Sequence, residues 1–248
     1  MASRSSLQQQ VLAYTFIAPA LLITLGVVAY PILNVIVRSF RVEGGYGLDH
    51  YIYLFTNRIA LDNLFYTLYI VIVTVVLAVA IAYGLALFMR FSNSAVSRTI
   101  GALYLIPRFI PGLVAVNAMI TVIRDSGLLN RIALTFGYDF KPGLMYNAKG
   151  IILMNLWFNI PFATMLILAA LSNIPDSVID SARDVGASRR VLFTKMIIPL
   201  TKKDVMIAAT FIFMGNIGSF TTPYLMDSTA PQMIGISLFT QFNNLHYE

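Results

Sequence analysis

The sequence contains no cysteine and only two histidines, His50 and His246. The lack of cysteine excludes disulfides, thiolate metal sites and a cysteine nucleophile. Both histidines fall in segments expected to be loops, which disfavours a serine hydrolase built on a residue such as Ser219. Neither a His-Glu-x-x-His pattern nor a Gly-x-x-x-x-Gly-Lys-Ser/Thr phosphate-binding loop occurs. The sequence therefore predicts no catalytic residues, no metal site and no cofactor bound by this chain.

Charge is also scarce. Charged residues make up 11% of the sequence and hydrophobic residues 58%, whereas a soluble domain has about 25% charged residues. The mean hydropathy is +0.77, which indicates an integral membrane protein. The net charge of +6 comes from Lys and Arg spread over loops, without a basic stripe of interleaved aromatics. We therefore expect contact with anionic membrane lipid and no nucleic-acid binding.

Five apolar runs are long enough to cross a bilayer, which takes about 20 helical residues. The first begins after a polar start without a clear cleavage site, so we expect it to be a retained span. The sequence predicts an all-α bundle of five transmembrane helices in one domain over residues 1–248, with spans at about 11–37, 63–89, 100–123, 151–171 and 205–226. The weakly apolar tail indicates either a sixth helix beyond Glu248 in the complete protein or a variant with five spans.

The third run is unusual because it contains Pro107-Arg108-Phe109-Ile110-Pro111. Two prolines interrupt the backbone hydrogen bonds, and an arginine inside a span costs a few kcal/mol unless it reaches a partner or water. One interpretation is a broken helix with Arg108 lining a path for solute. The alternative is that Arg108 extends to the membrane surface, or that the span begins nearer Pro111.

The later spans carry uncharged polar residues but essentially no acidic ones, which argues against a proton-coupled carrier. These residues either contact a passing solute or bind helices to one another. With Arg108, they are the candidates for a translocation path: Asn155, Asn159, Asn216, Ser219 and Thr221.

The long charged segment 172–204 lies between the last two apolar runs, and two short helices are expected in it. Pro175 and Asp176 suit a helix start, and Gly186 breaks the run. Ser188 can cap a second helix, which Pro199 is expected to end. The first helix is amphipathic, with one apolar face (Val178, Ile179, Ala182, Val185) and one charged face (Asp180, Arg183, Asp184).

This segment resembles the EAA motif of ABC-importer permeases, commonly Glu-Ala-Ala-x-x-x-Gly followed after nine residues by an apolar residue, x and Pro. Asp180 and Ser181 replace the first Glu and Ala, which keeps charge and small size. The alternative is an ordinary amphipathic loop. The resemblance implies that the segment forms a cytoplasmic coupling helix on an ATPase subunit, through Asp180, Ser181, Ala182, Asp184, Gly186, Ala187, Phe193 and Pro199.

Three further segments are similar to inner-membrane permeases: 63–67, 127–130 and 156–161. The stretches 218–225 and 231–233 resemble the polyamine, ferric-iron and phosphonate type, and sugar permeases share much of the rest. The resemblance implies import of a small polar solute (polyamine-like, phosphonate or similar), with a sugar as the alternative. A secondary carrier or channel, or a purely structural membrane subunit, are further alternatives.

The resemblance also implies partners. These are two ATPase subunits that hold ATP and Mg²⁺, a second permease subunit of the same or a related kind, and an extracytoplasmic solute-binding protein. The expected location is the cytoplasmic (inner) membrane of a bacterial-type cell. Six of the 17 Lys and Arg residues crowd the loop 172–204. Since basic loops stay inside, the N-terminus is expected to be cytoplasmic.

Overall fold

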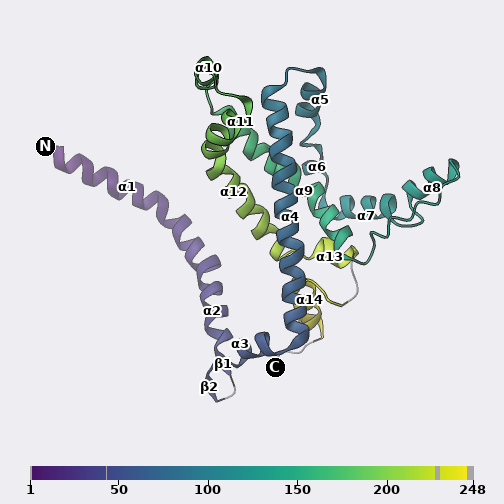
Figure 1. The fold of residues 1–248 in the computed structure, drawn as a ribbon. Helices are drawn as coiled ribbons and strands as arrows, with labels where there is room; N and C mark the ends of the chain where they lie inside the picture. Colours follow the sequence, from purple (N-terminus) through teal and green to yellow (C-terminus); the bar gives the residue numbers. More distant parts are fainter. Residues whose placement is uncertain (1, 43, 227–229, 245–248) are drawn as a thin grey trace. The chain divides into compact units, whose positions relative to one another are not determined.

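The computed structural model describes residues 2–42, 44–226 and 230–244 (Figure 1). These residues form helices apart from one short hairpin, which confirms the all-α class. His246 and the sixth helix expected beyond Glu248 lie outside the described residues. Contacts group the chain into two compact units, Met1–Leu61 and Asp62–Glu248, and each is described by itself. A single domain stays a prediction.

The first unit begins with one continuous helical run. It consists of α1 (Ala2–Ile23), the π-helical segment η1 (Thr24–Ala29) and α2 (Tyr30–Ser39). Pro31 is the second residue of α2, where the missing N–H follows the widened π turn. The predicted first span lies within this run.

A hairpin and a short helix follow: β1 (Arg41–Val42) pairs antiparallel with β2 (Gly45–Tyr46), and α3 covers Asp49–Thr56. His50 Nε2 lies 3.0 Å from the carbonyl oxygen of Arg41. His50 therefore sits in a short helix rather than in the expected loop, and it makes a local hydrogen bond.

The second span is α4 (Arg58–Phe91), and it packs through small side chains. Every fourth residue along its middle is fully buried: Thr74, Ala78, Ala82 and Ala86. The alanines share one core cluster with Ile167 of α9 (Ala148–Ser172) and Ile212 of α12 (Ile198–Ile217). Small side chains let helices approach closely, and this stripe forms part of the core of the second unit.

The third predicted span, 100–123, is three helices rather than one. They are α5 (Ala95–Leu103), α6 (Ile106–Phe109) and α7 (Gly112–Ile123). Ile110, which precedes Pro111, has ψ 125°, the extended conformation that a residue before proline favours. The stretch here that is long and apolar enough to cross a membrane is Gly112–Thr135, which includes α8 (Leu128–Thr135).

The segment between α7 and α9 contains α8 and a connection held by polar contacts. Asn130 accepts a hydrogen bond from the backbone N–H of Phe140 at 2.8 Å. Lys141 Nζ lies 2.6 Å from an Asp139 carboxylate oxygen, and this contact lowers the pKa of the Asp139 carboxyl below its ordinary value. Asn147 caps α9 by accepting from the N–H groups of Lys149 and Gly150.

The last part of the chain differs from two expectations. Pro199 does not end the second short helix: α11 (Arg189–Leu192), the π segment η2 (Phe193–Ile197) and α12 continue as one run. Pro199 is the second residue of α12 and follows the π turn, as Pro31 does in the first unit. The helix expected over 205–226 ends at Ile217, and α13 (Thr221–Met226) and α14 (Ile234–Asn243) are separate.

The sequence after Ile217 is unfavourable for a continuous helix. A helix continuing through residues 218–226 would lack one hydrogen bond, because Pro223 has no N–H to donate to the carbonyl of Ser219. That carbonyl instead lies against Gly235, where an added Cβ would be 2.6 Å from the oxygen.

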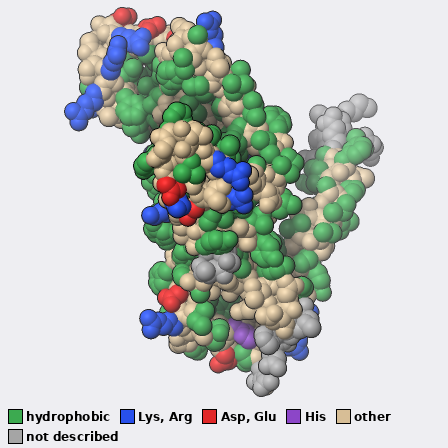
Figure 2. All heavy atoms as spheres, turned by 90° about the vertical axis from the view of Figure 1, so that its right-hand side faces the viewer, with side chains coloured by type: hydrophobic (Ala, Val, Ile, Leu, Met, Phe, Trp, Pro, Cys, Tyr) green, Lys and Arg blue, Asp and Glu red, His purple; other side chains and the backbone are tan. Residues whose placement is uncertain are grey.

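Four helical stretches in the described part of the chain are long and apolar enough to cross a membrane, namely Leu12–Ser39, Arg58–Phe91, Gly112–Thr135 and Ala148–Ser172. The predicted fifth, now α12, carries Lys202, Lys203 and Asp204 in its second turn. Figure 2 shows apolar side chains over most of the face in view, with charged side chains in separate groups. The count of five spans therefore stays a prediction.

Candidate functional site

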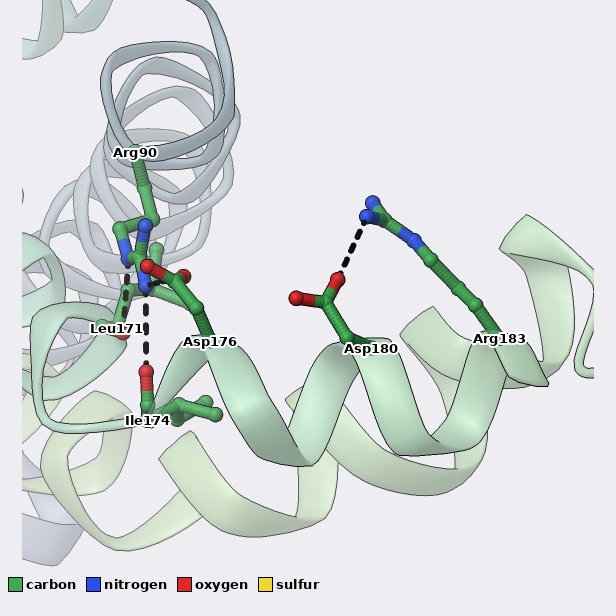
Figure 3. Close-up of polar contacts among 6 residues, drawn as sticks. All are labelled: Arg90, Leu171, Ile174, Asp176, Asp180 and Arg183. Carbon is green, nitrogen blue, oxygen red and sulfur yellow. Dashed lines mark hydrogen bonds and ion pairs between the residues drawn. The ribbon is translucent and has the colours of Figure 1, made fainter. Parts of the chain in front are cut away.

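The charged segment after α9 is fixed at its start by Arg90, the last basic residue of α4 (Figure 3). Its Nη2 donates to Asp176 Oδ1 at 2.5 Å and to the carbonyl of Ile174 at 3.2 Å, and its Nε donates to the carbonyl of Leu171 at 3.4 Å. One guanidinium thus binds the end of α9, the connector and the first residue of α10 (Asp176–Asp184). This contact also places the loops after α4 and after α9 at the same end of the unit.

Gly186 ends α10 through backbone geometry. Its φ is +83°, a left-handed conformation that glycine adopts without steric cost. Its N–H donates to the carbonyl of Arg183 at 2.9 Å, and the N–H of Ala187 donates to the carbonyl of Ala182 at 3.0 Å. These two bonds form a Schellman motif, with Val185 at the C-cap. Since an added Cβ would meet nothing within 4 Å, space does not require glycine here.

The two faces of α10 differ as the sequence predicts, with two exceptions. Ile179 is 3% exposed and joins the core, and Ala182 is partly buried against it. Asp180, Ser181 and Asp184 are exposed, and Asp180 pairs with Arg183 at 3.3 Å above the helix ribbon (Figure 3). The exceptions are Val178, which is 38% exposed, and Val185, which is 85% exposed. An apolar side chain thus stands free at the end of a charged helix.

The end of the segment also contacts α4. Ser188 accepts from the N–H of Val191 at 3.4 Å and caps α11, as expected. Phe193 packs edge-on against Tyr83 with ring centroids 6.0 Å apart. The Tyr83 hydroxyl lies 2.8 Å from Thr201 Oγ1. Arg90 and Tyr83 therefore hold the two ends of the segment on one helix, and neither had been singled out from the sequence.

The predicted path residues lie along the contact of α9 with α12. Nearest the charged segment, Phe162 packs edge-on against Phe211 at 6.0 Å. The guanidinium carbon of Arg108 lies 5.2 Å from the Phe162 ring centroid. The Arg108 side chain is exposed. Arg108 thus makes a cation–π contact at the edge of the helix pair.

One turn further on, three asparagines meet. Asn159 Nδ2 donates to Asn216 Oδ1 at 3.3 Å and to the carbonyl of Asn155 at 2.7 Å. Asn155 is 2% exposed and Asn216 is 5% exposed. Among the described residues, Asn155 Nδ2 has no hydrogen-bond partner. In this conformation the asparagines bind α9 to α12, and a role toward solute stays a prediction.

The other two candidates lie beyond the end of α12. The N–H of Ser219 donates to the carbonyl of Asn216 at 3.1 Å, and Thr221 is exposed at the start of α13. Two residues of α4 that sequence reasoning had not treated as a site hold this region. Asn63 Oδ1 accepts from the N–H of Gln232 at 2.8 Å, and Thr67 Oγ1 accepts from the N–H of Ile234 at 2.9 Å.

Comparison with protein families decides the identity of this arrangement. Residues 76–246 match the model of the binding-protein-dependent transport system inner membrane component. The chain belongs to this family. Its resemblance to ABC-importer permeases, inferred from the EAA-like segment, is thereby confirmed.

Curated relatives within the family include two transport permeases. The thiamine transport system permease protein ThiP of Brucella suis biovar 1 (strain 1330) is 30% identical over 149 residues, which is 60% of this chain. The spermidine/putrescine permease PotB of Escherichia coli (strain K12) is 23% identical over 199 residues, 80% of this chain and 72% of PotB. The match covers only 27% of the length of ThiP.

Solved structures of similar fold are ABC-transporter permeases. A chain of the bacterial alginate ABC transporter, in complex with an alginate pentasaccharide-bound periplasmic protein, has a TM-score of 0.80 at 17% identity. That match covers 98% of this chain and 87% of the other. The MetNI methionine ABC transporter gives a TM-score of 0.54 at 16% identity over 77% of this chain and 82% of that chain. At these identities the likeness shows the fold, which is that of an ABC-importer permease.

Proposed function

We propose that this chain is the membrane-spanning permease subunit of an ATP-driven importer for a small polar solute. In this proposal a partner ATPase binds ATP and Mg²⁺ and hydrolyses the nucleotide, and the chain itself does no covalent chemistry. The observation that carries the proposal is α10, a charged helix held on α4 by Arg90 and ended by the Gly186 motif, with Val185 exposed at its tip.

Such a helix suits a groove on another protein. Its buried face, Ile179 and Ala182, is already used within the chain, so Asp180, Asp184 and Val185 remain for a partner. An exposed apolar residue ringed by charges is the pattern of a small docking element. The proposed partners are two ATPase subunits on the cytoplasmic face, a second permease subunit and an extracytoplasmic solute-binding protein. The proposed orientation in the inner membrane has a cytoplasmic N-terminus.

The names of the relatives suggest the class of solute that we propose for this permease. Their names refer to thiamine and to spermidine and putrescine. These solutes are organic cations at neutral pH, which fits the polyamine-like reading of the sequence. The likeness to the alginate transporter is one of fold, so no observation favours a sugar.

The test is assembly with the ATPase subunit after Val185→Asp, which places a charge at the tip of α10 without disturbing a packed side chain. We expect the purified complex to lose ATPase subunit, and solute-stimulated ATP hydrolysis to fall at least about tenfold, because desolvating an unpaired charge at an interface costs more than about 1.4 kcal/mol. Phe136→Asp is the matched control, since Phe136 is the C-cap of α8, precedes a left-handed Gly137 and is 83% exposed. Equal ATPase content in both variants would remove the support for this function.

A further inference from the structure

Three aromatic rings gather just beyond the end of α12. Phe220 lies in the connector, Tyr224 in α13 and Phe239 in α14. The ring centroids of Phe220 are 4.9 Å from those of Tyr224 and 4.6 Å from those of Phe239, and the last two are 5.8 Å apart. We call these three residues the aromatic cluster. Tyr224 is 53% exposed and Phe239 is 40% exposed, so the cluster presents ring surface outward.

The cluster is held in place by neutral backbone contacts. Ile234 and Gln232, which lead into α14, donate their N–H groups to Thr67 and Asn63 of α4. Gly235 lies so close to the carbonyl of Ser219 that a Cβ there would be 2.6 Å from the oxygen. The helices that carry Tyr224 and Phe239 are therefore fixed against α4 and the end of α12. A ring surface fixed in this way is preorganised for a ligand.

The electrostatics around the cluster favour a positive ligand. No Lys or Arg occurs between Asp204 and Asn244. The 20-residue helix α12 ends at Ile217, and the C-terminal end of a helix carries a partial negative charge. Aromatic ring faces are also negative and attract ammonium and similar cations. Arg108 lies at the level of Phe162, on the other side of the Asn159–Asn216 contact.

We propose that the aromatic cluster is a contact site for an organic cation on its way through the permease. The ligand class is a nitrogen cation with apolar surface, such as a polyamine or a charged heteroaromatic ring. This inference rests on the proposed function and narrows its solute class to cations with apolar surface, because the exposed rings of Tyr224 and Phe239 attract cations and not an anionic group such as a phosphonate. Thr221, one turn before Tyr224 on α13, lies on the exposed side where such a ligand would pass.

The absence of cysteine from this chain makes a direct test possible. Thr221→Cys introduces a single thiol into the permease of the assembled complex, and the rate of its reaction with neutral N-ethylmaleimide is followed on the permease alone. We expect spermidine or thiamine to slow the reaction, and maltose and 2-aminoethylphosphonate to leave it unchanged. Protection by maltose equal to that by the cations, or no protection by either cation, would overturn the proposal.

Two further variants show whether the rings cause the protection. Tyr224→Leu with Phe239→Leu, in the Thr221→Cys background, should weaken protection by the cation about twofold to thirtyfold in concentration. Tyr224→Phe keeps a ring and should preserve it. Unchanged protection in the double leucine variant would assign the binding elsewhere. Suppose that Val185→Asp lowers the ATPase content of the complex as expected, but that neither cation slows the reaction of the thiol introduced by Thr221→Cys. This inference would then be refuted, and the proposed permease function would be retained.

Discussion

The two ends of α4 bind distant segments of the chain with different chemistry. At the end near the charged segment, the Arg90 guanidinium binds Asp176 and two backbone carbonyls, and the Arg90 side chain is 20% exposed. At the other end, Asn63 and Thr67 accept two backbone N–H groups without any charge. Both devices satisfy backbone groups that leave helical geometry, which is costly in a low-dielectric setting. Charge is used where one partner, Asp176, is exposed, and neutral side chains are used where both acceptors are buried.

Among the variants that test this comparison, removal of Arg90 should cause the largest loss of stability. Arg90→Leu leaves Asp176 and the carbonyls of Leu171 and Ile174 without their donor, and charge-assisted bonds contribute about 1.5–3 kcal/mol each before allowance for exposure. We expect a loss of about 3 kcal/mol in unfolding free energy of the detergent-solubilised protein, together with uncoupled ATP hydrolysis. Arg98→Leu, at an exposed arginine of α5, is the control. Equal unfolding curves for the two variants would show that the Arg90 contacts stabilise nothing.

Gly186 and Gly235 lie in the two segments that α4 binds, and they should respond differently to the same substitutions. Gly235→Ala forces a Cβ against the Ser219 carbonyl and should cost about 2 kcal/mol by overpacking. Gly186→Ala meets no atom and should cost about 1 kcal/mol through its left-handed φ. Asparagine, which tolerates that conformation, should restore stability at 186 and lower it further at 235. Thermal unfolding of the four variants measures this, and rescue by Asn at 235 would contradict the steric account.

Thr67 and Thr74 offer an isosteric test on one helix. Thr67→Val removes the acceptor of the Ile234 N–H, and a buried unpaired donor costs about 1–3 kcal/mol. Thr74 is equally buried, but within the described residues its Oγ1 has no partner. We therefore expect Thr67→Val to lower stability by about 1.5 kcal/mol and Thr74→Val to be neutral or stabilising. Equal losses of unfolding free energy in chemical denaturation would show that the hydrogen bond to Thr67 does not stabilise the protein.

The smallest loss of stability is expected from removal of the ion pair between Arg90 and Asp176. The Asp176 side chain is 75% exposed, and exposed ion pairs contribute about 0–1 kcal/mol. Asp176→Asn should therefore cost less than about 1 kcal/mol and leave the carbonyl contacts of Arg90 in place. Unfolding measured at low and high salt separates the contribution of the ion pair from that of the carbonyl contacts. A loss as large as that of Arg90→Leu would mean that the charge pair, not the backbone contacts, fixes α10.

The parts that the sequence predicts well are those with local causes. Pro175, Gly186 and Ser188 mark the helix boundaries of the charged segment because each acts on its own backbone within a few residues. The same reasoning anticipates the break around Pro111. The EAA-like spacing also led to the correct family, and the coupling and path roles of its residues remain predictions.

The parts that the sequence misses depend on distant contacts. Arg90 reaches residues 81 to 86 positions away, and no local pattern distinguishes it from Arg98. Gly235 lies against the carbonyl of Ser219 beyond the end of α12, and helical periodicity does not register such a contact. Pro199 lies within a helix because a π turn precedes it, and hydrophobic spacing does not reveal such a turn.

The central claim is that the tip of α10 contacts an ATPase subunit. A single thiol introduced by Val185→Cys, in a chain that has no other, can be linked to nearby lysines by a short thiol-to-amine reagent in the assembled complex. The account predicts a cross-linked product of permease and ATPase subunit from Val185→Cys and none from Phe136→Cys, at the equivalent position of α8. No product from Val185→Cys, or equal product from both positions, would contradict it.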